Sequence, residues 1–242
     1  MLYHSTRSNL HAVDSAQAVL EGLAPDGGLY MPESMPAFDW KACLQGSSMD
    51  MSTRILSALL PDIPNMEQLV KKAYTGKFET DHLTPTVPVG NFGVLELFRG
   101  PTSAFKDVAL SMLPQLLTAA KTEKGMEKDI LILTATSGDT GKAALEGFHD
   151  VDGVRITVFY PYGGVSQVQR AQMVTQEGGN VAVCAVYGNF DDCQTGVKDV
   201  FAACREKTLP FALSSANSIN IGRLAPQIMY YFRAYRDLLD AG

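Results

Sequence analysis

The sequence has few cysteines, no long apolar run and a single tryptophan among 242 residues. No two cysteines stand at C-x-x-C spacing and no histidine pair lies beside them, so we expect neither a disulfide framework nor a zinc site. A reduced, cytoplasmic protein is the simplest interpretation. No stretch approaches the roughly 20 apolar residues of a membrane span. The first residues also lack the basic start and apolar run of a signal peptide. The cysteines are Cys43, Cys184, Cys193 and Cys204.

Positive charge is scarce as well. Twenty basic side chains face 26 acidic ones, for a net charge of −6. This balance argues against a nucleic acid or an anionic membrane as a partner bound through bulk charge, although it allows a local basic pocket for a small anion. With 46% hydrophobic and 19% charged residues, the composition is that of a folded globular protein. The chain is long enough to bury a core without metal ions.

The pattern of the sequence changes near residue 80. Before it, helical periodicity dominates, so we expect a small helical N-terminal domain over residues 1–80 and an α/β domain over 81–242. Pro85 and Pro88 disfavour a helix and predict an extended linker over Asp81–Pro88. Three helices are expected in the first domain: Ser15–Leu23, Ser52–Leu60 and Met66–Tyr74.

In the second part, strands and helices alternate about every 25 residues, as in a doubly wound α/β fold. The almost wholly apolar run Asp129–Thr134 is typical of a parallel strand covered on both faces. Further strands are expected at Val94–Phe98, Val154–Tyr160, Asn180–Val186 and Pro210–Leu213. Helices are expected at Asp107–Thr122 (with Pro114 inside it), Thr140–Phe148, Val165–Glu177, Phe190–Lys207 and Ile221–Leu239.

Ligands of such sheets bind beyond the carboxyl ends of the strands, where we expect three polar segments. The first, Arg99–Asp107, follows the strand at Leu95 and carries Lys106 among small and apolar residues. A lysine in an apolar pocket has a lowered pKa, and its free amine can form a Schiff base. From these residues, a solvated lysine in a first helical turn is the simpler alternative.

The second segment, Thr134–Gly141, links a strand to a helix. Its small residues allow a ligand to approach the backbone, and helix N-terminal amides can bind an anion. It lacks the spacing of a P-loop or a dinucleotide fingerprint. A tight turn with Asp139 or Thr140 as N-cap explains it equally well.

The third segment, Ser214–Arg223, offers hydroxyls, amides and a guanidinium that could hold a phosphate. Ordinary N-capping by Ser218 or Asn220 is the simpler alternative.

Together these segments resemble threonine synthase, a family of pyridoxal 5'-phosphate (PLP) enzymes of the tryptophan-synthase-β fold type (PLP fold type II). The resemblance runs along the whole chain, in the family's order and spacing. It implies a small N-terminal domain followed by a doubly wound α/β domain whose C-terminal part is absent. The motifs are Tyr3-x-Ser5-Thr6-Arg7, Ala24–Pro32 (APDGGLYMP), Glu96–Asp107 (ELFRGPTSAFKD), Thr134–Gly141 (TATSGDTG) and Asn217–Asn220 (NSIN).

The resemblance also implies an activity, the conversion of O-phospho-L-homoserine and water to L-threonine and phosphate by a carbon–oxygen lyase. Lys106 would form the Schiff base with PLP and carry protons between substrate carbons. Asp139 is the acidic version of a position that is often Asn in the wider fold type. The implied cofactor-binding residues are Phe105, Lys106, Ser137, Gly138, Asp139, Thr140, Gly141 and Asn217. The implied substrate-binding residues are Thr102, Ser103, Ser166, Arg170, Ser218, Asn220 and Arg223. For Ser166 and Arg170, candidates for the phosphate, an exposed polar helix face is an equally good interpretation.

The family's glycine-rich loop for the cofactor phosphate lies downstream of the last helix here. Gly90–Gly93 spells a similar string, but it directly precedes the expected strand at Val94, so we interpret it as a turn between strands. We therefore expect the chain to be the N-terminal portion of a threonine synthase and to bind PLP weakly by itself. Two alternatives stay open: a threonine synthase-like phospho-lyase that releases a keto acid, and a non-catalytic binding homologue. Intact Lys106 and an intact TATSGDTG segment argue against the second.

Overall fold

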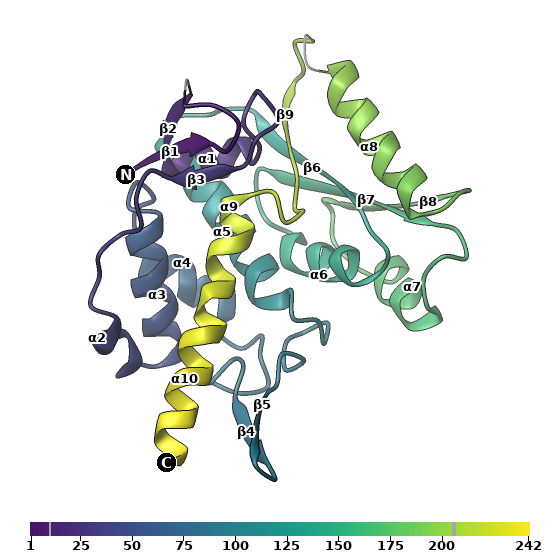
Figure 1. Cartoon of the computed structure of the whole chain (residues 1–242). Helices are drawn as coiled ribbons and strands as arrows, with labels where there is room; N and C mark the ends of the chain where they lie inside the picture. Colours follow the sequence, from purple (N-terminus) through teal and green to yellow (C-terminus); the bar gives the residue numbers. More distant parts are fainter. Residues whose placement is uncertain (10, 205–206) are drawn as a thin grey trace.

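The computed structural model describes residues 1–9, 11–204 and 207–242 and is built around a four-stranded parallel sheet with the order β8-β7-β6-β9 (Figure 1). The side chains of the inner strand β6 (Asp129–Ala135) alternate between two apolar clusters. Ile130 and Ile132 belong to the main core, whereas Leu133 and Ala135 belong to a smaller core on the opposite face. The predicted α/β fold with a parallel sheet is confirmed. Its strands are β6 (Asp129–Ala135), β7 (Val154–Pro161), β8 (Val181–Val186) and β9 (Phe211–Ser214).

Helices cover both faces of this sheet. Helix α8 (Phe190–Cys204) packs on β6 and β7 from one face of the sheet. Helix α6 (Asp139–Phe148) packs on β7 from the other face, and α5 (Asp107–Glu123) packs against α6. Residues 205 and 206, which the predicted helix Phe190–Lys207 includes, lie outside the described residues. Helix α7 (Gln167–Val174) is shorter than predicted at both ends. At its start, Ser166 forms a capping box with Gln169 and so sets the first helical residue.

The N-terminal part contains more than the predicted helices. Its helices are α1 (Ser15–Glu21), α2 (Trp40–Leu44), α3 (Ser48–Leu59) and α4 (Met66–Tyr74). A three-stranded antiparallel sheet, β2-β1-β3, was not predicted: β1 (Leu2–Ser5), β2 (Ala12–Asp14) and β3 (Tyr30–Pro32). Strands of three or four residues are too short to show a clear alternation. Both α1 and α4 pack on α5, so one core runs through this region. The domain boundary near residue 80 stays a prediction.

An antiparallel hairpin replaces part of the predicted linker. Strand β4 (Thr86–Val89) pairs with β5 (Phe92–Leu95). Gly90, with φ of +59°, and Asn91 form the turn between them, which confirms the interpretation of this segment as a turn. The hairpin is a separate two-stranded sheet, so the expectation that Arg99–Asp107 follows a strand of the main sheet was wrong.

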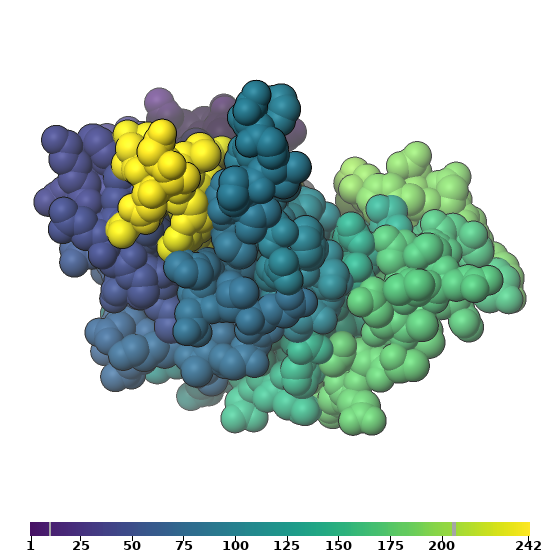
Figure 2. Space-filling model, turned by 90° about the horizontal axis from the view of Figure 1, so that it is seen from below, coloured from purple at the N-terminus to yellow at the C-terminus, as the bar shows by residue number. Residues whose placement is uncertain are grey.

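The predicted helix Ile221–Leu239 is broken. Helix α9 (Ile221–Leu224) passes into a 3-10 turn, Ala225–Ile228, before α10 (Met229–Ala241) begins. Pro226 lies in that turn, and a proline lacks the N–H and has a ring that clashes in a continuous α-helix. Helix α10 lies on the surface beside α2, α3 and the hairpin (Figure 2). Among the described residues, no helix has the length and apolar composition needed to cross a membrane.

Helices α5 and α6 approach each other at a glycine. Pro114 within α5 has no N–H, so the carbonyl of Leu110 lacks its usual partner one turn later. A Cβ added at Gly147 of α6 would lie 2.0 Å from the oxygen of that carbonyl. The separation of the two helices, and hence the position of α6, therefore requires glycine at this place.

We expect Gly147→Ala to lower the free energy of unfolding by about 2 kcal/mol, because an overpacking cost of about 3 kcal/mol exceeds the roughly 1 kcal/mol gained in helix propensity. The matched control is Gly196→Ala in α8, where an added Cβ meets nothing within 4 Å. That variant should gain up to about 1 kcal/mol. Urea denaturation measures the free energy of unfolding of both variants. Equal changes in that free energy would contradict the close approach of α5 and α6.

Candidate functional site

Charged groups from all three predicted segments meet around Lys106. Its side chain is half-buried, with Nζ 4.1 Å from the centroid of the Phe105 ring. Burial lowers the pKa of Lys106, the charge of Asp139 opposes this shift, and Arg223 and Lys142 lower the pKa further. A lysine with a lowered pKa has more of its amine in the neutral, nucleophilic form.

A buried carboxylate shapes the loop before Lys106. Asp107 accepts hydrogen bonds from the amides of Thr102 (2.9 Å) and Ala104 (3.3 Å) and from the Thr102 hydroxyl. Burial raises the pKa of Asp107 above its usual range, although these donors oppose the shift. A Cβ on Gly100 would lie 2.5 Å from the Asp107 carboxylate. The Thr102 hydroxyl is therefore engaged in holding the loop through Asp107. Ser103, with φ of +55°, is exposed at the tip of the loop.

Two distant side chains fasten this loop. The hydroxyl of Tyr230 in α10 donates to the carbonyl of Phe105, and Nε2 of Gln172 in α7 lies 3.5 Å from the carbonyl oxygen of Thr102. The sequence analysis missed both residues. Neither residue belongs to a sequence motif. Both reach the loop only because α7 and α10 pack against it in the folded chain.

The loop between β6 and α6 is folded around the Thr136 hydroxyl. Its Oγ1 accepts from the amides of Gly138 (2.9 Å) and Gly141 (2.8 Å). The N-cap is Gly138, with φ of +137°, rather than the predicted Asp139 or Thr140. In the part of the chain that the structure describes, the amides of Asp139 and Thr140 find no acceptor. These amides can bind an anion at the helix N-terminus.

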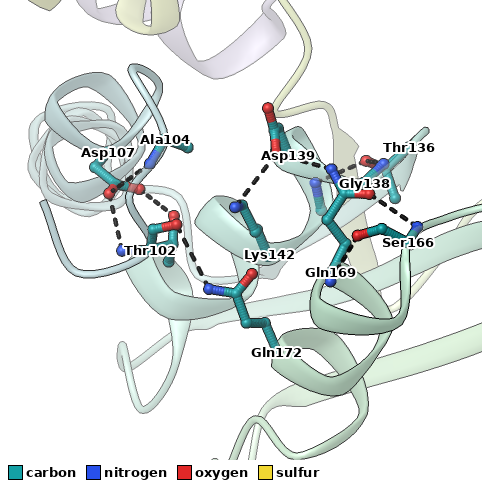
Figure 3. A network of polar contacts seen from close by, with 11 residues as sticks. Thr102, Ala104, Asp107, Thr136, Gly138, Asp139, Lys142, Ser166, Gln169 and Gln172 are labelled. Carbon is teal, nitrogen blue, oxygen red and sulfur yellow. Dashed lines mark hydrogen bonds and ion pairs between the residues drawn. The ribbon is translucent and has the colours of Figure 1, made fainter. Parts of the chain in front are cut away.

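Two side chains hold one oxygen of Asp139 (Figure 3). Nε2 of Gln169 donates to Oδ1 at 3.0 Å, and Nζ of Lys142 lies 3.3 Å from the same oxygen. Burial raises the pKa of Asp139, but these donors outweigh it and hold the pKa below its usual value. Ser166 caps α7 and accepts from the Gln169 amide at 3.2 Å, so its hydroxyl holds that helix end. The sequence analysis missed Lys142 and Gln169, although the spacing of Asp139 and Lys142 is that of a helical ion pair.

The third segment divides between fold and site. Asn220 accepts from the Gly222 amide (2.8 Å) and donates to the Val19 carbonyl (2.8 Å), so the alternative that it caps a helix is confirmed. Asn217 is half-buried in the preceding turn and Ser218 is exposed.

The guanidinium of Arg223 is 1% exposed, and burial lowers its pKa to about 10. It bonds to Gln227, but its Nε has no acceptor among the described residues. Arg170, in contrast to Arg223, is exposed on α7.

These residues suit an anionic ligand with an electrophilic carbon. Lys106 offers an amine, while the α6 amides and Arg223 offer donors for a negative group. The described residues contain no group of three or more His, Cys, Asp or Glu that could hold a metal ion, and all four cysteines are free. The fold and the site define an α/β protein with candidate anion-binding groups at the carboxyl edge of a parallel sheet, beside a half-buried lysine.

Comparisons with known proteins narrow this class. Residues 2–74 match a family model described as the N terminus of threonine synthase. The threonine synthase of Pseudomonas aeruginosa is 39% identical over 97% of this chain and 50% of its own length. The human protein named threonine synthase-like 1 is 35% identical over 94% of this chain and 33% of its own length. The crystal structure of PLP-bound threonine synthase from Brucella melitensis has a TM-score of 0.88 at 40% identity and covers 98% of this chain.

The predicted resemblance to the threonine synthases is therefore confirmed, and it is to their N-terminal portion. The chain spans about half the length of the P. aeruginosa relative and 52% of the B. melitensis chain.

Replacing Thr102 tests the loop geometry. We expect Thr102→Val to lower the free energy of unfolding by about 2 kcal/mol, because it removes a buried hydrogen bond to a carboxylate. Thr102→Ser keeps the hydroxyl and should lose less than half as much. Urea denaturation of the two variants makes the comparison. A serine variant as unstable as the valine variant would show that the hydroxyl is not what matters.

Proposed function

We propose that this chain carries the lysine-bearing part of a PLP-dependent threonine synthase site, centred on Lys106. The observation that carries the proposal is the half-buried Lys106 amine, which lies near Asp139 and near the buried guanidinium of Arg223. The resemblance to the N-terminal portion of threonine synthases supports it. The whole reaction belongs to the proposal, because the chain spans half the length of such relatives.

The residues present fit the cofactor. PLP, when bound, supplies an aldehyde that captures amines and a ring that withdraws electrons from the substrate's Cα. Lys106 would hold it covalently, and the amides of Asp139 and Thr140 would donate to its negative groups. The buried Nε of Arg223, without an acceptor among the described residues, is a donor of the kind an anion would satisfy. Phe105, Ser137, Gly138, Gly141 and Asn217 complete the proposed lining.

For the substrate we propose O-phospho-L-homoserine, converted with water to L-threonine and phosphate in the cytoplasm. The amine of Lys106 would take a proton from the substrate's Cα and return one later. Arg223 would face the departing phosphate, and Ser103, Ser218 and Arg170 are exposed donors that could reach its oxygens. The remaining predicted substrate residues act indirectly, because their side chains hold loops and helix ends: Thr102, Ser166 and Asn220.

Trapping the cofactor tests the assignment. The 242-residue chain is mixed with PLP at limiting concentration, reduced with borohydride and mapped by mass spectrometry. We expect the pyridoxyl group on Lys106 at least tenfold more often than on Lys128, an exposed lysine. Lys106→Ala should abolish the preferential labelling. Labelling of Lys106 no greater than that of Lys128 would overturn the proposal.

Product analysis separates the proposed reaction from its neighbour, which the similarity to threonine synthase-like 1 makes relevant. The chain is incubated with PLP and O-phospho-L-homoserine. We expect phosphate and threonine in equal amounts, at a rate abolished in Lys106→Ala. Phosphate with a keto acid in place of threonine would assign a phospho-lyase. No phosphate release from a chain that does label on Lys106 would limit this chain to cofactor binding.

A further inference from the structure

A second lysine lies in the site without an assigned role. Lys142 belongs to the first turns of α6 and is 8% exposed, more deeply buried than Lys106. Its Nζ lies 3.3 Å from Oδ1 of Asp139 (Figure 3). A buried lysine is expensive unless a nearby anion compensates its charge. Asp139 is that anion.

The Asp139 carboxylate is fixed on one side only. Lys142 and Gln169 both contact Oδ1, and the capping box of α7 holds Gln169 in turn. Gly138 permits this contact, since an added Cβ would lie 2.4 Å from the Gln169 amide carbon. Helices α6 and α7 together thus fix Oδ1 of Asp139, and no such contact engages Oδ2 within the described residues.

The charges around Lys106 have opposing effects. Asp139 favours the ammonium form of Lys106, whereas Arg223 from α9 and Lys142 from α6 disfavour it. The charge of Lys142 also opposes the rise in the pKa of Asp107, which adjoins Lys106 in the chain. Without Lys142, no neighbouring lysine would offset the charge of Asp139 at Lys106, and because both side chains are half-buried, water screens this attraction only in part.

We propose that Lys142 is a positioning residue that occupies the Asp139 carboxylate and so prevents Asp139 from holding Lys106 as an ammonium ion. An ammonium ion has no lone pair, so it can neither attack an aldehyde nor accept a proton. The importance of Lys142 for the reaction rests on the proposed function of Lys106. Its effect on the Lys106 amine can be measured without cofactor or substrate.

The experiment is competitive labelling of the cofactor-free chain with a trace of acetic anhydride between pH 6 and 11, read by mass spectrometry. The labelling rate of Lys106 relative to Lys128 gives a midpoint pH and a plateau. In Lys142→Met the midpoint should rise, because one repelling charge is lost and Asp139 is released. At pH 8 the relative rate should fall about threefold, the change for half a pKa unit. Lys142→Arg keeps the charge and should keep the midpoint.

The control Lys198→Met removes an exposed lysine from α8, on the other face of the sheet, and should leave the Lys106 profile unchanged. An unchanged midpoint in a folded Lys142→Met chain would overturn the proposal. So would a changed plateau at constant midpoint, which reports access to Lys106 rather than its charge. If Lys142→Met does not fold, Lys142→Gln is measured in its place with the same expected rise.

The outcomes separate this inference from the proposed function. A midpoint that depends on Lys142, in a chain whose Lys106 takes no pyridoxyl group, would refute the PLP assignment and keep the charge effect. Selective pyridoxyl labelling of Lys106 with a midpoint that does not change in Lys142→Met would support the PLP assignment and refute the charge effect.

Discussion

The site depends on the hydrogen bonds that the buried carboxylate of Asp107 accepts. It stands at the start of α5 and gathers the amides and hydroxyl of the loop before it, so that the chain turns sharply into the helix at Lys106. This loop has no support from the parallel sheet, because the strand preceding it belongs to a separate hairpin. A carboxylate with three donors can remain buried, and its hydrogen bonds fix the turn that leads into Lys106.

The rest of the site is arranged around that lysine by elements far away in the chain. Tyr230 fastens the peptide before Lys106 from α10, and Gln172 reaches the same loop from α7. Helix α6 brings Asp139 and Lys142, and its own distance from α5 depends on Gly147 facing the Leu110 carbonyl. Packing at the helix contact and charge at the site are therefore coupled, because a displaced α6 would carry the Asp139–Lys142 pair away from Lys106.

The charge pattern of the site suits a nucleophilic amine. Burial by itself favours the neutral form of a lysine, but a nearby carboxylate restores the ammonium form. Here two further cations stand around Lys106, one of them bound to that carboxylate and the other, Arg223, nearly fully buried. A cluster of this kind repels protons and attracts anions, which are the two properties that Schiff-base chemistry on a phosphorylated ligand requires.

The sequence by itself determined the parallel sheet, its covering helices and the three polar segments, because apolar runs and helical periodicity are local signals. The run at β6 is almost wholly apolar, as is typical of a parallel strand covered on both faces. Motif order and spacing were likewise enough to indicate the family. Tertiary structure decided what local signals do not carry. The strands of the N-terminal sheet are too short for periodicity, whereas the proline at the break, Pro226, is a local signal that the sequence analysis did not use.

The same division holds for the site. The sequence indicated Lys106, Asp139 and Arg223, since each lies in a segment of recognisable composition. It offered helix capping by Asn220 only as an alternative, and it did not show that Ser166 caps a helix. Nor did it show that Lys142, Gln169 and Tyr230 act on the surroundings of the lysine. Whether a polar side chain faces a ligand or its own backbone depends on the nearest donor or acceptor, and only the folded chain brings distant residues within hydrogen-bond distance.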